Sequence, residues 1–264
     1  MKTEFLKCKV NYRLIANAIL FCTLFFGKIQ AQNQPVKNVV IVHGAFADGS
    51  GWRKVFDILY KKGYNVTVVQ NPCSTLQADV DATNLALDKQ DGSTILVGHS
   101  WAGTVITQAG VHPKVVGLVY VSGFMPDKGE NTITLATSLP ASPESGLMAP
   151  DAKGYSYYDK DKFHAGFAAD LSKAEADFMY ASQGSFIGAS FGTPVTEAAW
   201  RDKPSYAVIP TEDKSINPDI LRNMAKRAGS VVTEVKGSSH VSFMSHPDVV
   251  AGVIMTASMK PVVK

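Results

Sequence analysis

Short runs of apolar and β-branched residues recur along the chain from residue 37 onward, and longer stretches of mixed polarity separate them. Such runs, bounded by turn residues, are typical of buried strands, whereas apolar residues that recur every three or four positions are typical of helices. The runs interpreted as strands cover residues 38–42, 65–70, 94–97, 115–122, 205–210 and 231–235. Because helical stretches alternate with these runs, the pattern predicts an α/β fold, a mostly parallel sheet with helices on both faces.

The stretches between the strands show the apolar spacing of helices that pack on a core. Trp52, Val55, Phe56 and Leu59 recur at helical spacing, and Gly63 ends that stretch. The predicted helices cover residues 51–62, 78–89, 101 to about 110, 218–228 and 247–259. The whole pattern therefore predicts one domain over residues 36–264.

The connection between the fourth and fifth predicted strands, residues 126–204, is long. Connections of this length without structure are uncommon in a compact domain, so we predict that it forms a helical cap inserted in the domain. Its aromatic residues are Tyr155, Tyr157, Tyr158, Phe163, Phe167, Phe178, Tyr180, Phe186, Phe191 and Trp200. We expect most of them to pack the cap itself and a few to line a ligand pocket.

The amino terminus differs from the rest of the chain. Lysine and arginine residues precede an apolar run at residues 14–26, and small and polar residues follow it. This order is typical of a secretory signal peptide. The run is shorter than the roughly 20 residues of a membrane-spanning helix, so a permanent anchor is the less favoured alternative. We predict cleavage of residues 1–31 after Ala31, and a mature protein that is secreted or periplasmic without a stable membrane anchor.

Composition narrows the choice of partners and cofactors. The 264 residues carry a formal net charge of +3 without a block of basic residues, which argues against nucleic acid as a partner. The loop from Gly44 to Gly51 approaches a phosphate-binding motif, but Ser50 stands where that motif needs lysine. No Cys, His and carboxylate group has metal-ligand spacing. We therefore expect no metal and no cofactor. Of the three cysteines, only Cys73 would remain after cleavage of residues 1–31, so we expect it to be a buried or half-buried apolar residue without an internal disulfide.

The strongest chemical motif is Gly98-His99-Ser100-Trp101-Ala102, in which a predicted strand leads to serine and then directly into a helix. This arrangement resembles a nucleophile elbow, which holds serine in strained backbone geometry at the tip of a strand. The residues two positions before and after the serine must be small, so that strand and helix can approach closely. Gly98 and Ala102 meet this demand, although glycine is the usual residue at the second position. Ser100 is therefore the candidate nucleophile.

A second motif, His43-Gly44-Ala45-Phe46, ends the first strand. Ester hydrolysis builds negative charge on the carbonyl oxygen, and backbone N–H groups aimed at that oxygen stabilise it. We predict that the backbone N–H groups of Ala45 and Trp101 form this oxyanion hole, provided that the first and third strands are neighbours with a crevice at their carboxyl ends. His43 is expected to be a hydrogen-bonded structural residue without a role in proton transfer.

A serine nucleophile needs a base, and the base needs an orienting acid. His240 follows the last predicted strand and Asp213 follows the one before it, so both lie at the edge of the sheet that carries Ser100. We predict that these residues form a catalytic triad in the chain order Ser, Asp, His.

Alternatives exist for both partners of the serine. His246 precedes Pro247 at a predicted helix start, where a capping role is favoured. Asp127, Glu212 and Asp219 could each supply the carboxylate. Asp127 is the strongest of these alternatives, because its strand also ends at the same edge of the sheet.

These motifs together resemble the α/β-hydrolase superfamily, and within it the cofactor-free serine esterases similar to plant methyl-ester esterases and hydroxynitrile lyases. The resemblance covers residues 36 to the carboxyl terminus and rests on four segments: His43–Phe46 with Gly51-Trp52, Gly98–Gly103, Thr211–Asp213 and Gly237–His240. It implies a three-layer fold with strand order 2-1-3-4-5-6. It also implies an acyl-enzyme on Ser100 that water resolves, with His240 as general base and then acid.

Departures from this pattern guide the choice of reaction. The related lyases carry Thr where this chain has Gly44, and Lys where it has Val241. The related dehalogenases carry Asp where it has Ser100. The expected protein is therefore a serine hydrolase that cleaves a small to medium apolar ester, as a monomer or homodimer. A lyase or acyltransferase on the same scaffold, and a hydrolase-like ligand-binding protein, are the alternative hypotheses.

Overall fold

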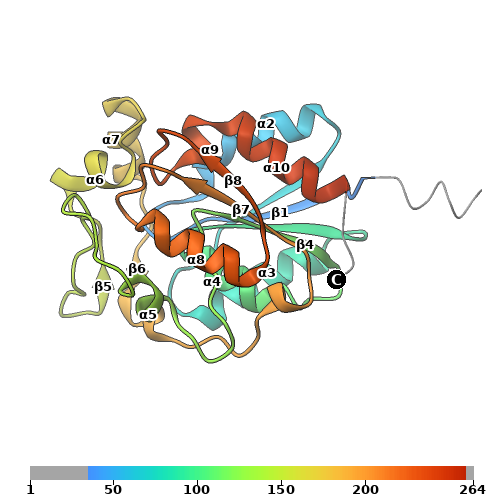
Figure 1. Ribbon diagram of the computed structural model, residues 1–264, viewed down its shortest axis with the longest axis horizontal. Coiled ribbons are helices and arrows are strands. Elements are labelled where there is room, and N and C mark those ends of the chain that lie inside the picture. Colours follow the sequence, from blue (N-terminus) through green and yellow to red (C-terminus); the bar gives the residue numbers. More distant parts are fainter. Residues whose placement is uncertain (1–34, 260–264) are drawn as a thin grey trace, which may run out of the picture. The chain divides into compact units, whose positions relative to one another are not determined.

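The computed structural model describes residues 35–259, which are built around a central sheet of six strands (Figure 1). The strands are β1 (Asn38–Val42), β2 (Asn65–Val69), β3 (Thr94–His99), β4 (Val115–Val121), β7 (Ser205–Pro210) and β8 (Val231–Val235). Neighbouring strands are parallel throughout, in the order β2-β1-β3-β4-β7-β8. The predicted α/β fold is confirmed. The numbering passes from β4 to β7 because two short strands, which the sequence did not predict, lie between them.

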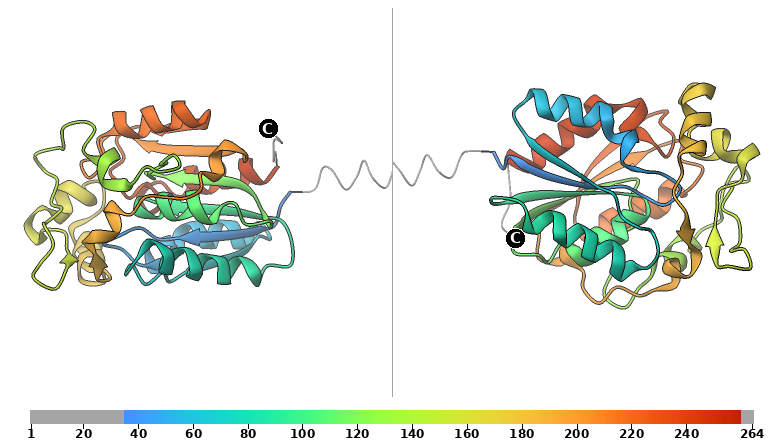
Figure 2. Two further views of the ribbon diagram at one scale, coloured as in Figure 1. Left: turned by 90° about the horizontal axis from the view of Figure 1, so that it is seen from below. Right: turned by 180° about the vertical axis from the view of Figure 1, so that it is seen from behind.

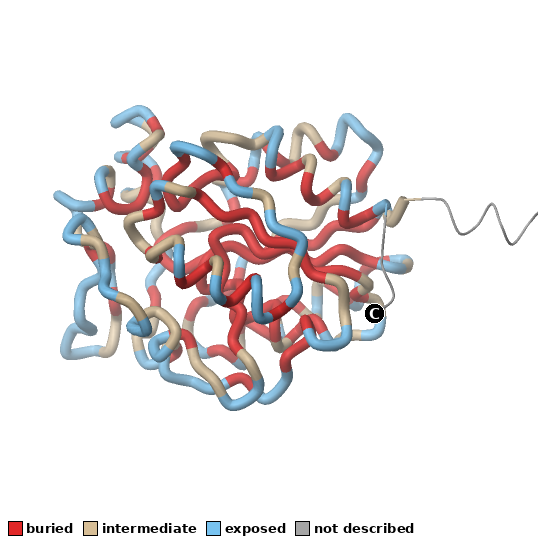
Figure 3. Tube along the Cα trace, in the orientation of Figure 1, coloured by how far each residue is buried: buried red, intermediate tan, exposed pale blue. Residues whose placement is uncertain are grey.

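Burial of whole strands explains why the strands of the sheet could be predicted from the sequence. Every residue of β1, β3 and β7 is buried, and these strands lie in the middle of the sheet (Figure 3). Strands covered on both faces have continuous apolar runs. The edge strands β2 and β8 leave several residues exposed or half-buried.

Helices cover both faces of the sheet (Figure 2). α2 (Arg53–Lys61) and α10 (Pro247–Met259) pack side by side on one face. α3 (Leu76–Asp88), α4 (Trp101–Ala109) and α8 (Pro218–Ala228) cover the other face. The sheet is thus the middle of three layers.

Local sequence sets the ends of these helices. The Asn217 side chain caps the start of α8, and Pro218 occupies its first turn, where a missing N–H does no harm. Gly229 ends the same helix in the left-handed conformation, with φ 64°. The sequence therefore predicted the bounds of α8 correctly.

The chain between β4 and β7 forms a cap of short elements. These are α5 (Thr132–Ala136), β5 (Tyr155–Ser156), α6 (Lys160–Phe167), α7 (Lys173–Ala181), β6 (Phe186–Ile187) and the 3-10 turns η2 (Gly188–Gly192) and η3 (Ala199–Arg201). β5 and β6 pair as a small antiparallel sheet. The cap thus contains the expected short helices, together with an antiparallel strand pair that the sequence did not predict.

The register of the sheet places the loop that follows β1 next to the turn that follows β3. Val42, the last residue of β1, pairs with Gly98 near the end of β3. Because β2 and β3 lie on opposite sides of β1, the chain leaves β1 at the point where the strand order reverses. A crevice opens at such a point in parallel sheets.

The amino-terminal prediction lies outside this part of the chain. Residues 1–31, the expected export signal, are not among the described residues, and the signal stays a prediction. Between residues 35 and 259, no helix combines the length and the apolar character needed to span a bilayer.

Candidate active site

Ser100 lies at the sharp turn between β3 and α4. Its backbone has φ 53° and ψ −119°, a conformation that residues other than glycine rarely adopt. A Cβ atom on Gly98 would lie 2.5 Å from the carbonyl oxygen of Ala102, and one on Gly103 would overlap the backbone of Phe124. Both positions therefore require glycine, whereas Ala102 is accommodated. Ser100 therefore has the backbone geometry and the small neighbours expected of a nucleophile elbow.

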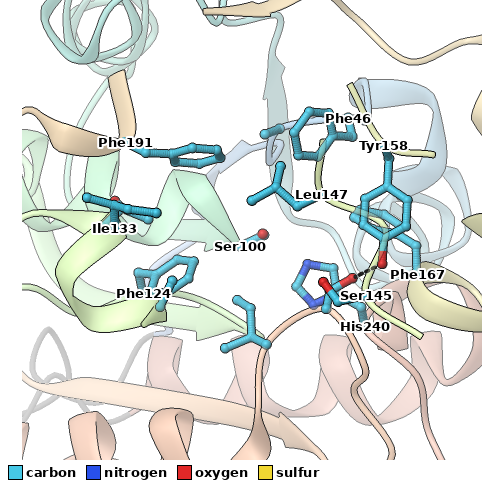
Figure 4. Close-up of a pocket in the computed structure, with 15 residues that line it drawn as sticks. Phe46, Ser100, Phe124, Ile133, Ser145, Leu147, Tyr158, Phe167, Phe191 and His240 are labelled. Carbon is cyan, nitrogen blue, oxygen red and sulfur yellow. Dashed lines mark hydrogen bonds between the residues drawn. The ribbon is translucent and has the colours of Figure 1, made fainter. Parts of the chain in front are cut away.

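Hydrogen bonds fix the backbone of the elbow. The Ser100 N–H donates to the Val121 carbonyl at 3.1 Å, and the Ser100 carbonyl accepts from Gly103 at 2.9 Å and Phe124 at 3.2 Å. Among the described residues, no side chain or backbone group is hydrogen-bonded to the Ser100 hydroxyl, which points into a pocket beside His240 (Figure 4). A hydrogen bond between a serine nucleophile and its base often becomes short only when substrate binds.

His240 and Asp213 form a buried pair next to the serine. Nδ1 of His240 lies 2.7 Å from Oδ2 of Asp213, and the two side chains are 1% and 0% exposed. The other carboxylate oxygen of Asp213 accepts from the backbone N–H groups of Ser215 at 2.8 Å and Ile216 at 2.9 Å. The carboxylate is therefore held rigidly, and it orients the imidazole with Nε2 free to face the pocket.

The alternative acids and base lie elsewhere. Asp127 is paired with Arg201, whose guanidinium lowers the pKa of that carboxyl. The side chains of Glu212 and Asp219 are 58% and 66% exposed, each beside its own basic partner. His246 is 37% exposed and lies 3.8 Å from a different carboxylate. The structure thus brings Ser100, Asp213 and His240 together. The alternative acids and the alternative histidine do not lie with them.

The loop after β1 lies directly against the nucleophile. A Cβ atom on Gly44 would lie 2.9 Å from Cβ of Ser100, so the backbone reaches Ser100 only because residue 44 is glycine. Ala45 lines the same pocket as Ser100, and Trp101 begins α4. Within residues 35–259, no group accepts a hydrogen bond from the backbone N–H of Ala45 or Trp101. Both donors predicted for an oxyanion hole are therefore available beside the serine.

The pocket above Ser100 is apolar and lies under the cap (Figure 4). It encloses about 500 Å³ of empty space, part of it open to solvent. It is lined by Ala45, Phe46, Ser100, Phe124, Thr132, Ile133, Ala136, Ser145, Leu147, Tyr158, Phe167, Phe191, Ser215, Ile216 and His240. As expected, only a few cap aromatics take part: Tyr158, Phe167 and Phe191. Apart from His240, none of the described lining residues has an acidic or basic side chain.

Comparison with known proteins agrees with this geometry. The model of the alpha/beta hydrolase family matches residues 39–253, which include the sheet, the cap and all three site residues. The chain belongs to the alpha/beta hydrolase family.

Members of the family with related sequences or folds include several hydrolases. The alpha/beta hydrolase nvfD of Aspergillus novofumigatus is 26% identical over 242 residues, which cover 83% of this chain and 96% of that protein. The pyrethroid hydrolase of Sphingobium wenxiniae is 26% identical over 257 residues, which cover 83% of this chain and 86% of that protein. The crystal structure of polyneuridine aldehyde esterase superposes with a TM-score of 0.72 at 18% identity, over 83% of this chain and 98% of the esterase. The resemblance expected from the sequence is confirmed.

Asp79, a buried acid on α3 of this alpha/beta hydrolase, was not among the residues predicted for the site. Its carboxylate is 0% exposed. One oxygen accepts from the indole N–H of Trp101 at 2.7 Å and the other from the Cys73 N–H at 2.7 Å. Burial raises the pKa of Asp79, and these hydrogen bonds oppose that rise. Cys73 itself is buried and free, as predicted.

Asp170, at the junction of α6 and α7, was also missed. Its carboxylate accepts from the backbone N–H of Ser239 at 3.0 Å and from the Ser239 hydroxyl. Ser239 immediately precedes His240. The cap is therefore attached to the loop that carries the candidate base, and only the three-dimensional contact reveals it.

Two further histidines are buried beside the site. His99 is fully buried, its ring lies 4.7 Å from that of His240, and burial lowers its pKa well below the ordinary value. His43 is 4% exposed, and Nδ1 hydrogen-bonds with the Gly44 carbonyl at 2.9 Å. Burial lowers the pKa of His43 as well. The expected structural role of His43 agrees with this contact.

Proposed function

We propose that this alpha/beta hydrolase cleaves the ester bond of a small to medium apolar substrate through an acyl-enzyme on Ser100. The observation that carries the proposal is the 2.7 Å contact between His240 and Asp213, buried beside a serine at a nucleophile elbow. Similarity to a pyrethroid hydrolase and to polyneuridine aldehyde esterase supports the same type of reaction.

The mechanism follows from the position of each group. Nε2 of His240 accepts the Ser100 proton while Oγ attacks the ester carbonyl, and Asp213 stabilises the imidazolium that forms. The N–H groups of Ala45 and Trp101 stabilise the negative charge on the carbonyl oxygen. His240 then gives its proton to the departing alcohol. Water, deprotonated by His240, attacks the acyl-enzyme, which releases the carboxylic acid and restores Ser100.

Gly44 favours hydrolysis over the lyase alternative. Thr occupies this position in the related lyases, and here even a Cβ atom would lie 2.8 Å from Nδ1 of His99 and 2.9 Å from Cβ of Ser100. A threonine therefore does not fit this loop without a shift of the elbow.

Labelling with a fluorophosphonate probe tests the mechanism. We expect mass spectrometry to find the probe on Ser100 of the purified protein, and we expect Ser100→Ala and His240→Ala to abolish labelling. Ser145→Ala is the matched control, because Ser145 lines the same pocket, and we expect this variant to be labelled like wild type. A folded protein that neither reacts with the probe nor hydrolyses p-nitrophenyl acetate would contradict the proposal and favour a ligand-binding role.

We also propose that residues 1–31 direct export, so that the enzyme acts in a periplasm or outside the cell. The basic residues, the apolar run and the small residues after it support this proposal. Amino-terminal sequencing of the mature protein is the test. We expect a mature chain that begins near residue 32. A protein that is found in the cytoplasm and still begins at Met1 would contradict export.

A further inference from the structure

A second apolar hollow lies in the cap next to the catalytic pocket. It is lined by Met148, Pro150, Gly192 and their neighbours, and it shares Ile133, Leu147 and Phe191 with the pocket above Ser100. Ile133 and Phe191 lie on the side of that pocket opposite His240 (Figure 4). The shared side chains therefore separate the two spaces.

This partition is open along its outer edge. Ile133 is 40% exposed and Leu147 is 45% exposed, and Met148 on the outer side is 50% exposed. Partial exposure of the separating side chains means that a flexible ligand can pass over them from one space to the other. Exposed apolar residues that are contiguous in this way are typical of binding surfaces.

The chemistry of the outer hollow matches that of the inner pocket. None of its described lining residues is charged, and the lining is formed mainly by aliphatic, aromatic and glycine residues. Such a surface offers no charged partner to a carboxylate, phosphate or ammonium group, whose burial without one is unfavourable. It favours an uncharged hydrocarbon group.

We propose that the outer hollow is a second subsite, which binds the distal part of an elongated, uncharged ester whose carbonyl lies at Ser100. The inference rests on the proposed function and specifies the substrate class: one arm of the ester is an apolar chain longer than the inner pocket. Burial of each further CH₂ group stabilises a complex by about 0.8 kcal/mol when complete. In this half-open hollow, we expect kcat/KM to rise about two- to four-fold per CH₂ once the chain passes the partition.

Gly192 gives a direct way to fill the subsite. A Cβ atom there meets no atom within 4 Å, so a side chain can start from this position without a backbone clash. Gly192 lines the hollow, so Gly192→Trp adds an indole to its wall and should reduce the space left for a ligand, whereas Gly192→Ala adds only a methyl group. Gly92 is also free of neighbours within 4 Å and lies on a distant loop, so Gly92→Trp controls for the added indole.

The experiment measures kcat/KM for p-nitrophenyl esters from acetate to laurate, and for acetate esters of alcohols of the same lengths. We expect wild type, Gly192→Ala and Gly92→Trp to prefer the longer members of one series. Gly192→Trp should lose that preference and still hydrolyse the shortest esters normally.

An identical chain-length profile in wild type and Gly192→Trp would overturn the inference while leaving the proposed function intact. If Gly192→Trp with that profile also bound phosphatidylcholine vesicles less well than wild type, the hollow would be a membrane contact instead of a substrate subsite. Absence of hydrolysis for every ester in wild type would instead refute the proposed function itself.

Discussion

The indole N–H of Trp101 donates a 2.7 Å hydrogen bond to the fully buried carboxylate of Asp79. Trp101 directly follows Ser100, and its backbone N–H is one of the two proposed oxyanion donors. The same carboxylate accepts from Cys73, so Asp79 connects the start of α4 to the chain before α3. We therefore infer that Asp79 is a positioning residue for the proposed oxyanion hole.

We expect Asp79→Asn to lower kcat about ten-fold with little change in KM, because a displaced donor weakens binding of the transition state only. The amide has one acceptor for two donors, so the free energy of unfolding should also fall by about 1–3 kcal/mol. Steady-state kinetics and urea unfolding measure the two effects. Asp81→Asn, at an exposed position on the same helix, is the control. An equal rise in KM would contradict the positioning role.

The choice of triad acid is tested by two matched substitutions. Asp213→Asn should reduce kcat by about 10³- to 10⁴-fold, because the amide favours the wrong imidazole tautomer. Asp127→Asn removes an ion pair with Arg201 and should leave kcat within about two-fold of wild type, since partly exposed pairs contribute little. The reverse order of these effects would assign the acid to Asp127.

Acidification should destabilise the fold through its buried histidines. Burial lowers the pKa of His43 and of His99, so below about pH 6.5 the unfolded chain binds protons that the folded chain does not. Stability is therefore full above that pH and falls as the pH drops toward the folded-state pKa values, by up to about 1.4 kcal/mol per pH unit for each histidine. Urea unfolding between about pH 7.5 and pH 5.5 measures this slope. His43→Gln should reduce the slope, and an unchanged slope would show that His43 does not contribute.

The contact between Asp170 and Ser239 predicts a kinetic role for a cap residue. Asp170→Ala removes the acceptor for two donors that precede His240, so we expect kcat to fall about ten-fold and the unfolding free energy by about 1–3 kcal/mol. Asp177→Ala, an exposed acid of α7 paired with Lys173, should change neither beyond about 0.5 kcal/mol or two-fold. Equal behaviour of the two variants would refute the role of Asp170.

The core of the fold could be predicted from sequence because its elements carry local information. The predicted bounds of β1, β7, β8, α8 and α10 agree with the structure. Buried strands show uninterrupted β-branched runs, and α8 carries its own caps. The positions of Ser100, Asp213 and His240 followed because each lies just after a predictable strand.

The cap and its contacts could not be predicted in the same way. Its elements are short, and β5 and β6 have only two residues each, too few for a periodic pattern. Asp79 and Asp170 act through partners that are distant in the sequence. Nothing in their local sequence distinguishes them from ordinary helix and loop acids, so only the folded chain shows their roles.

At position 100, the residue that is best for protein stability differs from the residue that is needed for activity. With φ 53°, the position suits glycine, and a serine there carries strain of about 1–3 kcal/mol. A library selected only for heat tolerance would therefore be enriched in Ser100→Gly variants, which have no nucleophile. Directed evolution of a more robust enzyme must consequently hold this residue constant and seek its gains elsewhere in the sequence.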